Sequence, residues 1–286
     1  MTAHAQPSLC GLPVYLLVDP YFGEPSFVAL QVSEIDHPSV ALERRENAWQ
    51  RKVFAAASSE HPIPPASLPY VVELNGAADE WLEAATDEAA HDHAQSLSTG
   101  FHKIGTGTLI ETSLSGDALM TRLQQMWTMH LSGRRRHLRL GSPRVMELVF
   151  HSAPPSETQT WLGPIERWHH LTRDGIWRLV QGQADLHEHM SDQAFYGRHA
   201  IQQAMAAKPA PPLHLDGALK TTLLHSETIT QTLDAWQRMG HAFSTSLIQA
   251  LQTLLEQVAW TAAGTQEQKI ERCLAHLHQT HGKELS

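Results

Sequence analysis

Histidine is the residue type in this sequence that most readily suggests chemistry, because 20 of the 286 residues are histidines. Two pairs, His91 with His93 and His187 with His189, are each separated by a single residue. On a β-strand this spacing would place both imidazoles on one face, where a third ligand could complete a catalytic zinc site. A metal-dependent hydrolase that uses His187 and His189 is therefore one hypothesis for the function.

Solvated surface histidines are the favoured interpretation of the same pairs. Both pairs lie in polar stretches next to helix-like sequence, and on a helix residues i and i+2 point in different directions. The H-E-x-x-H motif is absent, and neither cysteine belongs to a C-x-x-C pair. The adjacent His169 and His170 receive the same interpretation, so we expect no metal site and no cofactor.

A nucleophilic active site is not indicated either. The sequence contains no G-x-S-x-G motif, and Cys273 lies on an apolar stripe, where burial is the expected role of a cysteine. Trp161, Trp168 and Trp177 could form a box that stacks on a ligand, but three tryptophans around one predicted hairpin are more typical of a core. We therefore expect no catalytic residue.

Composition and charge indicate a globular protein that does not bind nucleic acid. Hydrophobic residues make up 42% of the chain and charged residues 18%, which excludes a wholly disordered protein. The formal net charge is −9, which gives no reason to expect a nucleic-acid partner. The one dense basic run, residues 134–136, is interpreted as a solvated turn, since phosphate binding normally needs a wider basic face.

Cysteine usage and hydropathy together predict a cytoplasmic protein with no membrane partner. Cys10 and Cys273 lie near opposite ends of the chain and do not suggest a disulfide framework. A secretory signal would require a lysine or arginine before the apolar run Val14–Val18, and none is present there. No apolar stretch approaches the ~20 residues that span a bilayer.

Hydrophobic patterning predicts an N-terminal lobe that mixes strands and helices. The run Val14–Val18 is continuously apolar, which is typical of a strand buried on both faces. Further strands are predicted at residues 27–32, 70–74 and 108–112. Helices are predicted at residues 38–57, 78–90 and 115–131, from apolar residues that recur at three- and four-residue steps.

A basic stretch in the middle of the chain predicts a corner between a strand and a helix. The strand is expected at residues 136–140 and the helix at Pro143–Ser152. Ser142 is a suitable N-cap, because its hydroxyl can accept a hydrogen bond from the first turn, and Pro143 suits the first helical position. Arg139 and Arg144 are expected to brace this corner through carboxylates or carbonyls.

The sequence changes character after about Gly182. A hairpin is predicted from residues 165–169 and 176–180, and strand-like sequence does not recur after it. Helices are expected at residues 191–207, 215–236, 243–258 and 270–277, with a proline-rich linker at about 208–213. The predicted fold class is an α/β (α+β) lobe at residues 1–182, with a mixed sheet and flanking helices, followed by an all-helical lobe at residues 183–286.

Five phrases, in order along the chain, resemble the adaptor, or effector-chaperone, family of bacterial type VI secretion systems. They are the L-L-V-D that ends at Asp19, Pro69–Leu74, Leu119–His130, Arg139–Arg144, and Gly163-Pro164-Ile165 followed by Trp168. The resemblance extends from Val14 to Trp177. The family has a Tyr-Asp pair before the proline of the fourth phrase, whereas this chain has Gly141 and Ser142, which removes a carboxylate.

The resemblance implies a non-enzymatic function, in which the protein binds a secreted effector protein and helps load it onto a spike tip protein. An immunity protein that neutralises a toxin is a further alternative. Packing inside the helical lobe is the favoured interpretation of its apolar stripe. The alternative is that the stripe supplies the partner surface, through Trp236, Phe243, Leu247 and Leu251. The residues expected to shape the structural corner are Asp19, Arg139, Ser142, Pro143, Arg144, Gly163, Pro164 and Trp168.

Overall fold

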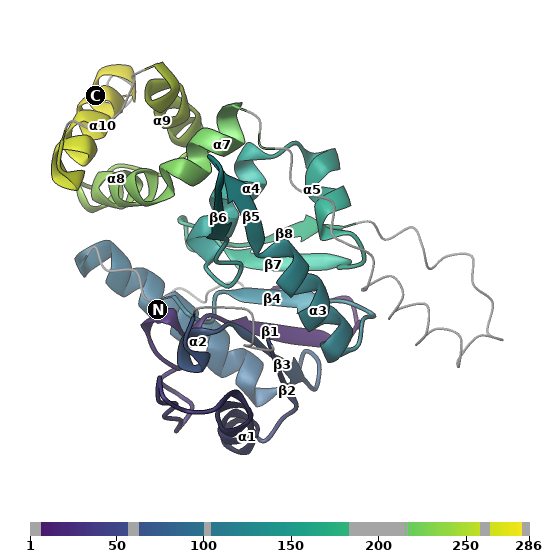
Figure 1. Cartoon of the computed structure of the whole chain (residues 1–286). Coiled ribbons are helices and arrows are strands. Elements are labelled where there is room, and N and C mark those ends of the chain that lie inside the picture. Colours follow the sequence, from purple (N-terminus) through teal and green to yellow (C-terminus); the bar gives the residue numbers. More distant parts are fainter. Residues whose placement is uncertain are drawn as a thin grey trace.

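The computed structural model describes residues 7–56, 63–99, 104–182, 215, 217–257 and 264–281, and its centre is a six-stranded sheet (Figure 1). The strand order is β2-β3-β1-β4-β7-β8, and every neighbouring pair in it is antiparallel. The strands are β1 Val14–Val18, β2 Val53–Ala55, β3 Tyr70–Leu74, β4 Thr108–Glu111, β7 Arg167–Leu171 and β8 Trp177–Gln181. The predicted fold class, an α+β lobe followed by helices, is confirmed.

Helices pack against both faces of the sheet, and β1 shows how. Tyr15 and Leu17 belong to an apolar cluster shared with α3, α4 and α5, whereas Val14, Leu16 and Val18 belong to a second cluster shared with α1 and α2. Successive strand residues point to opposite faces, so both faces of β1 are buried, as its continuous apolar sequence predicts. The helices are α1 Pro38–Trp49, α2 Glu80–Thr99, α3 Gly116–Met126, α4 Pro143–Ser152 and α5 Pro155–Leu162.

Two predictions for the first part of the chain are wrong. Residues 27–32 are not a strand, because the chain turns there and Phe27 packs against Trp49 and Trp81. The helix predicted at residues 38–57 ends at Trp49, since Gln50 adopts a left-handed conformation with φ of 50°, and the chain then forms β2. In contrast, the helix predicted at residues 78–90 continues to Thr99.

The helix predicted at residues 115–131 is also too long. It ends at Met126, and the chain then forms a small hairpin from β5 Thr128–Leu131 and β6 Arg134–His137. Ser132 and Gly133 connect these strands, with φ of 51° and 73°. Positive φ at both loop residues gives the two-residue turn whose twist suits a hairpin. The predicted strand at residues 136–140 therefore begins and ends earlier. Residues 134–136 are exposed, as predicted, but they form part of β6 and not a turn.

The described part of the C-terminal lobe consists of α7 Gly217–Leu224, α8 Ser226–Arg238, α9 Thr245–Gln257 and α10 Gln266–His281. The single helix predicted at residues 215–236 is thus divided in two at His225. The helix predicted at residues 191–207 and the linker at about 208–213 lie outside the described residues. Among the helices that the structure describes, none combines the length and the apolar character needed to cross a membrane.

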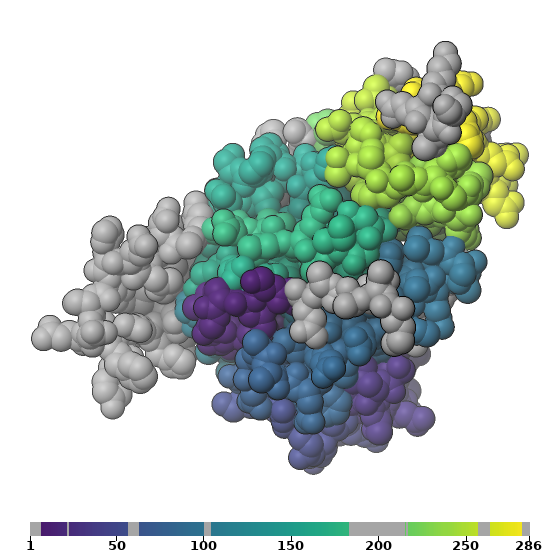
Figure 2. All heavy atoms as spheres, turned by 180° about the vertical axis from the view of Figure 1, so that it is seen from behind, coloured from purple at the N-terminus to yellow at the C-terminus, as the bar shows by residue number. Residues whose placement is uncertain are grey.

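The helical lobe packs closely against the α+β lobe, and the two share side chains. Leu148 of α4 belongs to the apolar cluster of α8, α9 and α10, while Leu219 of α7 belongs to the main sheet cluster. The buried amide of Gln252 on α9 donates to Ser152 and Thr222, at 2.7 and 2.6 Å. Seen from behind, the atoms of the helical lobe lie directly against those of α2 and of the β7–β8 hairpin (Figure 2).

A fully buried arginine in the β7–β8 turn joins the two lobes. The Arg173 guanidinium has no exposed surface and lies 2.5 Å from the Asp234 carboxylate on α8 and 3.1 Å from the Glu147 carboxylate on α4. It also donates to Thr230, at 3.0 Å. In return, the Gln237 amide donates to the Arg173 carbonyl, at 2.9 Å. The β7–β8 turn, α4 and α8 are therefore joined through one residue.

Replacing this arginine tests how much the junction depends on it. Arg173→Met leaves two buried carboxylates without their cation, so we expect the free energy of unfolding to fall by about 3–5 kcal/mol. Arg178→Met in the same hairpin is the matched control, because the Arg178 side chain is 50% exposed and, among the described residues, forms an ion pair with Asp174 alone. That control is expected to cost less than about 1 kcal/mol. Urea denaturation measures the free energy of unfolding of both variants. Equal losses of stability would contradict a special role for Arg173 at the junction.

Candidate functional site

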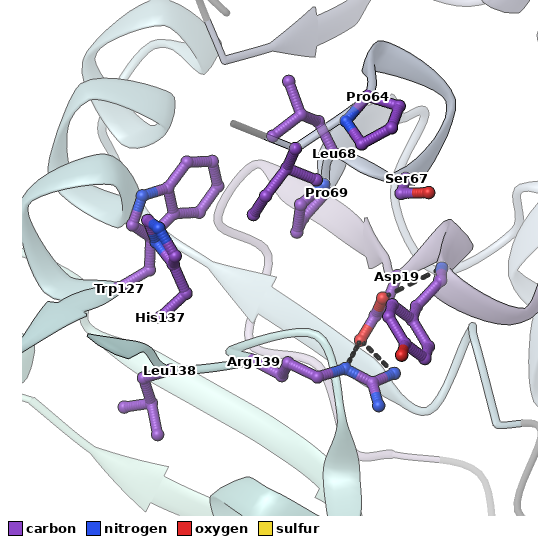
Figure 3. A pocket seen from close by; sticks show the side chains of 11 residues that line it. Asp19, Pro64, Ser67, Leu68, Pro69, Trp127, His137, Leu138 and Arg139 are labelled. Carbon is purple, nitrogen blue, oxygen red and sulfur yellow. Dashed lines mark hydrogen bonds and ion pairs between the residues drawn. The ribbon is translucent and has the colours of Figure 1, made fainter. Parts of the chain in front are cut away.

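A pocket of about 380 Å³ opens at the predicted corner, beside the end of β1 (Figure 3). Three segments supply its walls: the chain after β1, the short helix η3 Pro65–Ser67 with its flanks, and the residues on either side of the β5–β6 hairpin. The lining residues are Asp19, Tyr21, Ile63, Pro64, Ser67, Leu68, Pro69, Trp127, His137, Leu138 and Arg139. Most of these side chains are apolar, so the pocket suits an apolar group.

An ion pair between Asp19 and Arg139 borders the pocket, as the dashed lines of Figure 3 show. Both Nε and a terminal nitrogen of Arg139 donate to one oxygen of Asp19, at 3.1 and 2.8 Å. The guanidinium also lies 4.3 Å from the centre of the Tyr21 ring, and the Tyr21 amide donates to the other Asp19 oxygen at 3.1 Å. The expectation that Arg139 braces the corner through a carboxylate is confirmed.

The start of α4 differs from the prediction in one respect. Ser142 occupies the N-cap position, but its hydroxyl accepts no hydrogen bond from the helix. The backbone carbonyl of Ser142 accepts instead from the Met146 amide, at 3.0 Å, and Pro143 occupies the first turn. Because Pro143 lacks an N–H and has its φ preset for a helix, the helix begins without a side-chain cap.

Arg144 braces the corner in a way the sequence did not predict. Its terminal nitrogen lies 2.6 Å from Nδ1 of His93 on α2. Burial, together with the nearby Arg173, lowers the Arg144 pKa to about 10. The expected partner was a carboxylate or a carbonyl, so the imidazole partner is a correction. The contact is possible because α2 continues well beyond its predicted end and carries His93 to α4.

The remaining predicted corner residues do not line the pocket, and Gly163 and Pro164 lie near the end of β4 that is far from Asp19. Gly163 has φ of 57°, and a side chain there would meet the Arg122 guanidinium, 2.6 Å from its Cβ. The Pro164 carbonyl accepts from the Thr112 hydroxyl at 3.1 Å. Trp168 is fully buried in β7, with its ring centre 6.0 Å from that of Phe150. These residues hold the chain between α5 and β7 against the sheet, so their contribution to the site is structural.

The histidine pairs do not converge on a metal site in the part of the chain that the structure describes, where no three potential ligands cluster. His91 is exposed and bonds to Gln95, while His93 is buried against Arg144. His169 lies 2.7 Å from the Glu111 carboxylate. The pair His187 and His189, on which the hydrolase hypothesis rests, lies outside the described residues.

The apolar residues expected to bind a partner are instead part of a core. Trp236, Leu247 and Leu251 are buried in the cluster of α8, α9 and α10, and the half-buried Phe243 packs against it. Trp236 on α8 and Leu247 and Leu251 on α9 belong to the same apolar cluster, so they pack inside the lobe. This packing confirms the favoured interpretation of the stripe and corrects the alternative, an exposed partner face. Cys273 is buried in the same cluster, as predicted, and burial raises its thiol pKa to about 11.

The pocket itself could not be found from the sequence. The sequence predicts that Asp19 and Arg139 belong to the corner, but it does not indicate that Leu68 and Trp127 are their neighbours. Trp127 comes immediately after α3, where the apolar periodicity predicts that the helix continues. A Ser-Gly dipeptide after an apolar run is a turn signal, and Ser132-Gly133 could have indicated the hairpin that positions Trp127 and His137.

Gly141 allows the close approach that forms the corner, and this can be tested. A Cβ at position 141 would lie 2.7 Å from the Asp19 Cβ and 3.3 Å from its backbone. We therefore expect Gly141→Ala to lower the free energy of unfolding by about 1–3 kcal/mol. Gly217→Ala is the control, because the nearest atom to its Cβ would be 3.5 Å away. An unchanged urea midpoint for Gly141→Ala would show that the corner does not need a glycine.

Burial of His170 predicts a specific sensitivity to acid. Burial lowers its pKa to about 3, with a smaller contribution from Arg178. The unfolded chain takes up a proton near pH 6.5, whereas the folded protein does not until about pH 3. Stability is therefore lost as the pH falls below 6.5, by about 2 kcal/mol between pH 7.5 and 5 for this residue alone.

The variant His170→Phe removes this proton uptake, and its ring would lie beside Phe150, whose ring centre is 5.3 Å from that of His170. Urea titrations of both proteins at the two pH values measure the effect. The wild type is expected to lose more stability on acidification than the variant does. Parallel losses in the two proteins would mean that His170 is not the residue responsible.

The site therefore combines an apolar pocket with acidic and basic side chains that already pair with each other. Such an arrangement can bind an apolar segment of a partner, and the walls come from distant parts of the chain. Comparison of the sequence with protein-family models found no match, and comparisons with curated proteins and with solved structures found none either.

Proposed function

We propose that this protein is a non-enzymatic cytoplasmic adaptor, which binds a secreted effector protein and helps load it onto the spike tip of a type VI secretion system. The pocket beside Asp19 and Arg139 is the proposed contact for a segment of the partner. The proposal transfers the function implied by the sequence resemblance to a particular surface of the molecule.

One observation supports the proposal most directly. Four of the five phrases that carry the resemblance each contribute a side chain to the pocket: Asp19, Pro69, Trp127 and Arg139. These residues are separated by up to 120 positions along the chain, and they belong to different elements. If the phrases served only to maintain the fold, their convergence on one open pocket would not be expected.

The chemistry of the pocket agrees with binding. The Asp19 side chain is only 2% exposed and is held by two hydrogen bonds from Arg139. A general base must reach the proton that it removes, and this carboxylate is directed at the guanidinium. The apolar walls formed by Leu68, Trp127 and Leu138 instead favour the burial of a side chain from the partner.

Deletion of the gene in the native bacterium tests the function. We expect one effector to disappear from the culture medium while it is still made in the cell, because an adaptor acts between synthesis and loading. Quantitative mass spectrometry of the medium and of cell lysates measures both pools. Killing of the producing cell would favour the immunity protein, and unchanged secretion would exclude an adaptor.

Complementation with variants connects the function to the pocket. Ser67→Trp places a large side chain at the pocket wall, so it is expected to restore secretion poorly. Ser156→Trp on the exposed face of α5 makes the same change away from the pocket and is expected to restore secretion fully. Thermal melting of both purified variants is the control for correct folding. Stoichiometric zinc in the purified protein would instead favour the hydrolase.

A further inference from the structure

We propose that the pocket binds an extended acidic segment of the partner, with an apolar side chain in the pocket and a carboxylate two residues away on the β5–β6 hairpin. This inference rests on the proposed function and names the chemistry of the segment that the adaptor recognises. The feature that supports it is the continuity between the pocket and the basic side chains of the hairpin.

Strand geometry places a basic side chain next to the pocket. His137 lines the pocket and is the last residue of β6. Arg135 lies two residues earlier, so its side chain projects from the same face of the strand, about 7 Å away. His130 on β5 is directly opposite Arg135. A row of three nitrogen-bearing side chains therefore leads away from the pocket along one face of the hairpin.

The hairpin also carries positive charge that the described residues do not neutralise. Arg134, Arg135 and Arg136 are all exposed, and none of them belongs to an ion pair within the described ranges. The chain as a whole has a net charge of −9, so this is a local excess of the opposite sign. A ligand that carries carboxylates would be attracted to it, and the attraction would be sensitive to salt.

The ion pair at the pocket adds to the positive character. The Arg139 side chain is 33% exposed, whereas the Asp19 side chain is 2% exposed. An incoming segment therefore meets the guanidinium before the carboxylate. At the end of the pocket formed by Arg139, a negative charge on the segment is therefore favoured over a positive charge.

The shape of the site favours a protein segment over a nucleic acid. A pocket of about 380 Å³ is at the lower end of the range of ligand pockets, about 300–1,000 Å³. It can take an apolar side chain, whereas a phosphate backbone would gain nothing from walls made of Ile63, Leu68 and Leu138. In an extended segment, alternate residues point the same way with the spacing of β6. An apolar residue in the pocket therefore places the second residue along beside Arg135.

A peptide series tests this pattern with the full-length protein. The probe is a fluorescent peptide with a phenylalanine at its centre and a glutamate two residues before and two residues after it, with serine elsewhere. Matched peptides replace both glutamates with glutamine or with lysine, and a fourth replaces the phenylalanine with serine. Fluorescence anisotropy at low and at moderate salt gives the dissociation constants.

We expect the glutamate peptide to bind about tenfold more tightly than the glutamine peptide and to weaken as salt is added. Arg135→Glu should weaken binding of the glutamate peptide by about tenfold or more and improve binding of the lysine peptide. Arg272→Glu makes the same change on an exposed position of α10, and it should alter neither. Ser67→Trp and the peptide without phenylalanine should each abolish binding.

Several results would overturn the inference. Equal affinity for the glutamate, glutamine and lysine peptides would show that charge does not contribute to binding. Binding unaffected by Ser67→Trp would show that the pocket is not the binding site. Tighter binding of an oligouridine probe than of any peptide would point to nucleic acid. A concentration-dependent dimer in light scattering that Ser67→Trp abolishes would make a second copy of this chain the occupant.

The outcomes also separate this inference from the proposed function. If the peptides behave as expected but gene deletion leaves effector secretion unchanged, the surface is correct and the adaptor function is wrong. Secretion could instead depend on the gene and on an open pocket, while the Arg135→Glu variant supports normal secretion and binds the glutamate peptide like the wild type. In that case the adaptor function is correct, and the inference of an acidic segment is wrong.

Discussion

The arrangement of the two lobes depends on the buried guanidinium of Arg173. Apolar packing between helices is not directional, so the contacts of Leu148 and Leu219 alone would allow the helical lobe to turn on the sheet. A buried cation has no such freedom, because removing it from its carboxylates is costly. Arg173 fixes α8 through Asp234 and α4 through Glu147 at the same time. One side chain therefore constrains the mutual position of three elements, in addition to the hydrogen bonds that Gln252 donates.

The Asp19–Arg139 pair has the corresponding role at the pocket, with a different consequence. Both pairs connect elements far apart in sequence, but Arg173 is completely buried whereas Arg139 is partly exposed. Full burial makes the first pair a structural junction. Partial exposure leaves the second pair at the surface, where it can both hold the corner and face a ligand. The difference in solvent access therefore separates a residue that maintains the fold from one that can also bind.

The sequence predicts those features of the fold that depend on local patterns. Val14–Val18 and Tyr70–Leu74 are continuous apolar runs, and both are strands. The helix at Pro143–Ser152 also matches, because prolines border it on both sides. The hairpin at residues 128–137 was missed, since its apolar residues also match a helical period and only the turn at Ser132-Gly133 distinguishes the two. The pocket depends on which distant segments become neighbours, and no local pattern carries that information.

The burial of the helical stripe changes where a partner can bind. The apolar side chains of Trp236, Leu247 and Leu251 stabilise the helical lobe by packing against each other, so exposing them to a partner would require that lobe to open. A partner that instead uses the pocket beside Arg139 needs no such rearrangement, because the pocket is open in the folded protein. The proposed adaptor function also requires release of the cargo, and a small contact reinforced by exposed charges is weaker than a shared hydrophobic core. The pocket and its basic hairpin therefore suit reversible binding better than the helical lobe does.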